Sequence, residues 1–198
     1  GALSRELGFM GRHRVAEEII VARDIALFKA FASPSLRYHV LHLSTKEALR
    51  VIEKAQLEGL RVSTEVAPQH FALTSDLLRS GNANFKMNPP LRESADNLAM
   101  REGLADGSIS AIATDHAPHP KENKNKGIEQ APPGMLGVET ALSASITHLV
   151  ETKVLTLEEL IKVMSINPAR IINAHKRENG GHGLDISPGN PANITVFN

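Results

Sequence analysis

Asp115, His116 and His119 lie just after a short apolar stretch, residues 109–113, in the run Ala-Thr-Asp-His-Ala-Pro-His. The apolar stretch predicts a buried strand, and a carboxylate at its end needs a metal ion, a cation or hydrogen bonds in place of water. Metal-assisted hydrolases place Asp and His side chains at the carboxyl ends of parallel strands. On spacing alone, a polar loop that follows a core strand is an equally good interpretation.

Two more histidines lie near the ends of predicted strands. His42 lies at the end of residues 38–43, and His70 follows residues 61–67. His39, three residues before His42, is expected on the opposite face of its strand. Each histidine alone is more often a hydrogen-bonded core or loop residue than a ligand. Together, at one edge of a parallel sheet, they predict a metal or acid–base site.

Neutral imidazole and carboxylate ligands suit zinc, and the chain has no cysteine that could supply a thiolate ligand or a disulfide. Asp115 would then bind the ion. It would also accept a proton from a zinc-bound water, whose pKa the metal lowers to about 7.

Strand and helix patterns alternate along the chain, which predicts an α/β fold. The helix after residues 38–43 is capped by Ser44 and Thr45 and stopped by Gly59, so strand, helix and strand form a parallel, right-handed βαβ unit. Helices are expected at residues 15–31, 46–58, 96–104, 138–150, 157–164 and 167–172, with a short one within 73–84, and strands at 38–43, 61–67, 109–113 and 193–197.

The remaining segments are expected to be loops. Residues 1–13 read as a locally basic loop and residues 68–70 as the loop after the second strand, while two adjacent prolines keep residues 86–92 extended. Residues 120–133 form a long polar stretch, which is either a solvated loop or a lid beside the site.

The composition excludes several classes of function. The chain has 198 residues with 22 basic and 22 acidic side chains, enough for one globular core, and no net charge that would attract nucleic acid or an anionic membrane. No apolar run approaches the ~20 residues of a membrane span, so we expect neither a membrane span nor a signal peptide in this sequence.

Five segments, in order along nearly the whole chain, resemble dihydroorotase of the class I-like bacterial type that is associated with aspartate transcarbamoylase. They are His39-Val-Leu-His-Leu-Ser-Thr-Lys46, Glu65-Val-Ala-Pro-Gln-His70, Lys86-Met-Asn-Pro-Pro-Leu-Arg92, Ala113-Thr-Asp-His-Ala-Pro-His119 and Ala131-Pro-Pro-Gly-Met-Leu-Gly-Val-Glu-Thr140.

The resemblance implies the (β/α)8 TIM-type barrel of the metal-dependent amidohydrolase superfamily. The three predicted strands match its last three βα units, so residues 1–178 are expected to be a partial barrel and residues 179–198 the start of a small C-terminal β element. The family's His-x-His pair, its bridging carboxylate and its fifth-strand His have no match in the sequence. We therefore expect the C-terminal half of a barrel, inactive when isolated.

The resemblance also implies roles for individual residues. It makes His42 and Asp115 zinc ligands and Asp115 the catalytic base and acid. It makes His119, Asn88 and the backbone near Met87 and Ala131 contacts to the substrate.

The implied reaction is the reversible, zinc-dependent opening of dihydroorotate to N-carbamoyl-L-aspartate in pyrimidine biosynthesis, in the cytoplasm. Expected partners are a second copy of the chain or aspartate transcarbamoylase. Two alternatives stay open, namely another cyclic amidohydrolase such as allantoinase or hydantoinase, and a non-catalytic dihydroorotase-like subunit that supports aspartate transcarbamoylase.

Overall fold

A computed structural model describes residues 1–31, 33–174 and 186–197. The expected boundary between the partial barrel and the C-terminal element, at residues 178 and 179, lies outside the described residues.

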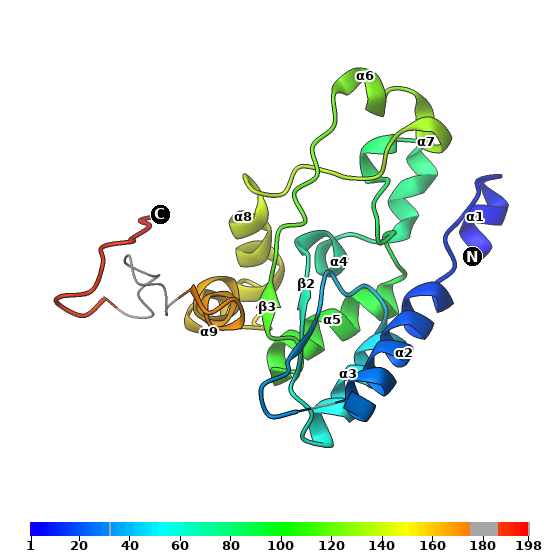
Figure 1. Ribbon diagram of the computed structural model, residues 1–198. Helices are drawn as coiled ribbons and strands as arrows, with labels where there is room; N and C mark the ends of the chain where they lie inside the picture. The colour runs from blue at the N-terminus through cyan, green and yellow to red at the C-terminus, as the bar shows by residue number, and fades with distance from the viewer. Residues whose placement is uncertain (32, 175–185, 198) are drawn as a thin grey trace.

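Three parallel strands in the order β1-β2-β3 form the sheet: β1 Tyr38–Val40, β2 Val62–Val66 and β3 Ala111–Ile112 (Figure 1). The predicted parallel arrangement is confirmed, with shorter strands. Single hydrogen bonds continue the pairing, because Leu43 N–H donates to Glu65 O (2.9 Å) and Ala113 N–H donates to Val66 O (3.1 Å). The carboxyl ends of all three strands therefore meet at one edge.

Helices α2, α3 and α5 pack beside the sheet, and each lies close to where the sequence predicts it (Figure 1). Thr45 caps α3, accepting the N–H of Ala48, and the predicted capping box of Thr156 and Glu159 opens α9. The helices are α1 Ala2–Glu6, α2 Val15–Phe31, α3 Lys46–Leu57, α4 Pro68–Ala72, α5 Ser94–Asp106, α6 Lys121–Lys124, α7 Gly127–Gln130, α8 Ala141–Ser145, α9 Leu157–Ile161 and α10 Asn167–Ile171. Two short 3-10 helices, Ser75–Ser80 and Ala83–Phe85, and two π-helical turns, Ile146–Val150 and Lys162–Ile166, complete them.

Three segments predicted as loops contain short helices, so those predictions were wrong. Helix α1 lies within residues 1–13, α4 replaces the loop at 68–70, and α6 and α7 lie within 120–133. Helices of four or five residues are too short to show hydrophobic periodicity, although Pro68 at the first position of α4 is a helix-start signal.

Two further predictions need correction. The helix expected at residues 138–150 begins only at Ala141, because residues 135–138 run alongside the 114–117 segment instead. The strand expected at residues 193–197 is absent. Its side chains are exposed, including Val196 and Phe197, and a strand requires a neighbour for its backbone hydrogen bonds.

The two faces of β2 differ. Val62, Thr64 and Val66 are buried against the helices, whereas Ser63 and Glu65 on the other face are half-buried. This second face of β2 is therefore polar. Exposed apolar side chains occur in several parts of the chain, and four of them lie on α2: Ile19, Ile20, Leu27 and Phe31. Among the described residues, no helix is both long and apolar enough to cross a membrane.

Candidate active site

His42 and Asp115 lie just beyond the ends of β1 and β3, and both have left-handed backbone conformations. Their φ angles are 35° and 47°; of the described non-glycine residues, only Lys153 and Asn173 also have positive φ. Such conformations are strained and persist where the surrounding structure enforces them, often at functional sites. Since β1 ends at Val40, His42 is not part of the strand, and the face argument made for His39 does not extend to it.

Asp115 is a half-buried carboxylate whose neighbours come from the other two strand ends. Gln69, buried on α4, donates its Nε2–H to Oδ2 of Asp115 at 3.2 Å. Burial raises the pKa of Asp115, and the Glu65 carboxylate raises it further. The charge of His42 and the hydrogen bond from Gln69 act in the opposite direction. Asp115 and His42 thus lie near enough for their charges to interact.

A polar row continues from Asp115 along the inner face of the sheet. His39 Nδ1 lies 2.8 Å from Ser63 Oγ, and its Nε2 lies 3.1 Å from Glu65 Oε2. His39 is therefore held by side chains of β2, as a satisfied polar residue on that face.

His70 does not join Asp115 at the sheet edge. It is buried in α4, where its Nε2 lies 3.1 Å from Pro89 O, and its buried Nδ1 is unpaired. Burial lowers the pKa of His70 to about 4, so the imidazole is neutral at physiological pH. The adjacent Gln69, not His70, contacts Asp115.

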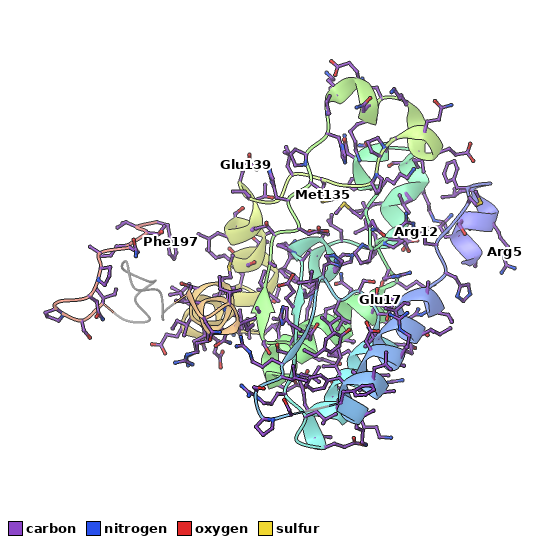
Figure 2. All side chains as sticks on the ribbon, viewed as in Figure 1. Arg5, Arg12, Glu17, Met135, Glu139 and Phe197 are labelled. Carbon is purple, nitrogen blue, oxygen red and sulfur yellow. The ribbon has the colours of Figure 1, made fainter. Side chains whose placement is uncertain are left out.

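Met87 and Asn88 lie in segment 86–92, which is not helical, as expected, but bends at Asn88 and Pro89, where the peptide bond is cis. Asn88 is exposed, and its Oδ1 accepts a hydrogen bond from Arg12 Nη1. Met87 and Arg12 both line a cavity of about 650 Å³, which His42 and Asp115 do not line. Figure 2 shows Arg12 between the N-terminal segment and the rest of the molecule, with Arg5 at the outer edge.

Residues 131–134, Ala-Pro-Pro-Gly, form a segment that we call the strap. Its Pro133 carbonyl accepts a hydrogen bond from exposed His119 Nε2 at 3.0 Å. Gly134 has φ 141°, and a Cβ there would lie 2.5 Å from Ala117 O, so only glycine permits this approach. The chain then pairs His116 with Met135, which Figure 2 labels above the sheet. The two motifs that contain His119 and Ala131 therefore pack against each other.

A zinc site needs more donors than the described residues bring together. Imidazole and carboxylate are suitable ligand types, but the described residues include no group of three His, Cys, Asp or Glu that could hold a metal ion. His42 and Asp115 alone do not make a complete zinc site.

Three residues near the site were missed by the sequence analysis: Gln69, Arg12 and Lys124. The position of Gln69, just after a strand, was a usable signal. Arg12 lies in the segment interpreted as a locally basic loop, and Lys124 in the segment interpreted as a solvated loop or a lid, and neither interpretation identified a specific contact for the side chain.

Comparison with protein-family models gives a match to the Amidohydrolase family over residues 4–198. The chain belongs to the amidohydrolase family. A dihydroorotase from Streptomyces coelicolor is 44% identical over 196 residues, which cover 99% of this chain and 44% of that protein. A dihydroorotase from Geobacillus sp. is 46% identical over 169 residues, 85% of this chain and 39% of that protein.

Solved structures of this family have the same fold. An L-hydantoinase (dihydropyrimidinase) from Arthrobacter aurescens superposes with a TM-score of 0.77 at 30% identity, covering 88% of this chain and 38% of that one. A dihydropyrimidinase from Brevibacillus agri gives a TM-score of 0.78 at 23% identity, covering 91% and 39%. The chain therefore shares its fold with these two enzymes, and it spans less than half the length of the relatives named above.

Proposed function

We propose that this chain supplies part of the active site of a dihydroorotase, which opens the cyclic amide of dihydroorotate to N-carbamoyl-L-aspartate in pyrimidine biosynthesis. The observation that carries the proposal is Asp115, a half-buried carboxylate in a strained backbone beside His42 at the carboxyl edge of a parallel sheet. The 43–46% identity to curated dihydroorotases supports the choice of substrate.

Asp115 is the proton-transfer residue in this proposal. Its raised pKa favours uptake of a proton from the attacking water and its delivery to the departing ring nitrogen. Gln69 holds one carboxylate oxygen, Oδ2, and leaves Oδ1 for the proton. His42 and Asp115 would be two of the zinc ligands, and bound zinc would act as a Lewis acid toward the ring carbonyl. The other ligands would lie outside the described residues.

The substrate-binding side consists of His119, Asn88, Met87 and the backbone of Ala131. Arg12 donates a hydrogen bond to Oδ1 of Asn88. In this proposal the side-chain NH2 group of Asn88 donates to oxygen atoms of the ligand. Dihydroorotate, with two ring carbonyls and a carboxylate, presents such oxygen atoms.

Two other functions make different predictions. The first alternative is a hydantoinase, which the 30% identity to the Arthrobacter aurescens enzyme supports. A hydantoinase would prefer ring substrates without a carboxylate. A non-catalytic subunit would bind aspartate transcarbamoylase without turnover. A half-buried Asp with a raised pKa is of no use to such a scaffold, because removing it from water is unfavourable.

A hybrid protein tests the proposal, with this chain replacing the aligned segment of the Streptomyces coelicolor relative. Hydrolysis of dihydroorotate, hydantoin and allantoin is then measured with zinc present, alongside this chain alone. We expect kcat/KM for dihydroorotate to exceed the other two by about a hundredfold or more, as in sites that recognise a charged group, and the chain alone to be inactive. A preference for hydantoin, or turnover by the chain alone, would contradict the proposal.

A further inference from the structure

Lys124, the last residue of α6, is buried with only 8% of its surface exposed. It takes part in none of the ion pairs among the residues that the structure describes. A buried ammonium without a carboxylate partner is unfavourable and needs other hydrogen-bond acceptors. Burial lowers the pKa of Lys124, and the nearby charge of Lys86 lowers it further.

The acceptors of Lys124 are carbonyl groups of the strap. Its Nζ donates to Pro132 O at 3.1 Å and to Gly134 O at 2.8 Å. His119 binds the carbonyl between them, that of Pro133. Three successive carbonyl groups of the strap are thus held by side-chain donors.

The strap depends on these side chains because two of its four residues are prolines without an N–H. Its two backbone donors are Ala131 N, bound to Gly127 O at 2.9 Å, and Gly134 N, bound to Lys86 O at 2.8 Å. The second bond joins the strap to the segment that contains Met87 and Asn88. A shift of the strap would therefore move the Pro133 acceptor of His119 and disturb both substrate-binding segments.

We propose that Lys124 is a positioning residue, whose ammonium fastens the strap so that His119 and the Ala131 backbone face a bound ring. The part concerning the ring rests on the proposed dihydroorotase function. The fastening of the strap does not, and can be measured without substrate.

Hydrogen exchange of the chain itself tests the fastening. Lys124→Met removes the donor and the charge at similar length, and Lys126→Met is the matched control, since Lys126 is exposed and bonds only to Asn123 among the described residues. We expect Lys124→Met to speed exchange of the Gly134 amide about tenfold, while Lys126→Met and the amides of β2 stay unchanged. Unchanged Gly134 exchange in Lys124→Met would overturn the inference.

Lys124→Gln provides a second variant should Lys124→Met also speed exchange in β2. It keeps an N–H donor without a charge to bury, and we expect an intermediate increase at Gly134. If amide exchange in β2 and at Gly134 became faster to the same extent in both variants, Lys124 would stabilise the fold as a whole and not the strap. That result would overturn the inference.

The same variants in the hybrid protein test the effect on substrate. We expect Lys124→Met to raise KM for dihydroorotate about tenfold with kcat changed less than about threefold, and Lys126→Met to change neither. An unchanged KM alongside faster Gly134 exchange would overturn the link to substrate binding. A hybrid that hydrolyses hydantoin but not dihydroorotate would instead refute the proposed function and leave the exchange result standing.

Discussion

Asp115 and His42 have strained backbone conformations, and both side chains are partly buried. Both features are unfavourable to the free energy of folding for polar residues. The cost is reduced by a hydrogen bond from Gln69 and by the attraction between the two side chains. Such an arrangement keeps a carboxylate available at a fixed position, which a proton-transfer residue requires.

The buried His70 makes folding stability depend on pH. An unfolded histidine has a pKa of about 6.5, whereas burial lowers the pKa of folded His70 to about 4. As pH falls from about 6.5 toward 4, the unfolded chain binds a proton that the folded chain excludes, so stability is lost. We expect His70 to account for a loss of about 2 kcal/mol in unfolding free energy between pH 7 and pH 5.

Urea unfolding at the two pH values measures this loss in the wild type and in His70→Gln, which keeps a donor for Pro89 O but does not titrate. The stability difference between pH 7 and pH 5 should shrink in His70→Gln and stay as in the wild type for the exposed control His13→Gln. An equal pH dependence in all three proteins would contradict the assigned burial of a neutral imidazole.

The roles of His70 and Gln69 could not be separated from the sequence. Both follow β2, and histidine is the more frequent metal ligand, so His70 attracted the functional interpretation. In the structure Gln69, and not His70, is the residue near Asp115. The helical backbone of α4 directs His70 into the core and Gln69 toward Asp115. The sequence did predict that His42 and Asp115 lie at the same edge of the sheet. This prediction needs only the parallel direction of the strands, which the structure has.

Among the elements, α2 fixes the segment that follows His42. Glu17 on α2 accepts the backbone N–H groups of Ser44 and Thr45, each at 2.9 Å, and lies 3.4 Å from Arg92 Nη2. We expect Glu17→Ala to lower the free energy of unfolding by about 3 kcal/mol, because it leaves the partly buried guanidinium of Arg92 without this carboxylate and two backbone amides without an acceptor. Urea unfolding at pH 7.5 measures the change.

Glu102→Ala is the control for that prediction, as Glu102 is an exposed residue of α5. It should change stability by less than about 0.5 kcal/mol. Similar losses in the two variants would show that the Glu17 contacts add no specific stability.

Long elements were predictable and short ones were not. The bounds of α2 match the prediction, and α3 and α5 match within two residues at each end, because apolar spacing and caps mark them. The short helices α6 and α7 make tertiary contacts that a local pattern does not reveal, namely those of Lys124 with the strap and of Lys86 with the carbonyl of Glu129. The absent strand at residues 193–197 shows that β-rich composition alone does not create a strand.

The residues that the structure describes form a three-stranded parallel sheet with helices packed beside it, and apolar side chains of α2 are exposed. Three strands do not close a barrel, and two donors do not complete a zinc site. Because the chain spans 44% of the length of the Streptomyces coelicolor relative, we expect catalysis only when the remaining part of such a barrel is present.

The most direct test compares kcat for dihydroorotate in the zinc-loaded hybrid protein with that of its Asp115→Asn variant, after circular dichroism has established that both fold alike. The proposed proton transfer predicts a loss of about a thousandfold in Asp115→Asn. Turnover by Asp115→Asn within tenfold of the parent hybrid would contradict the assignment of Asp115 as the catalytic residue and, with it, the proposed active site.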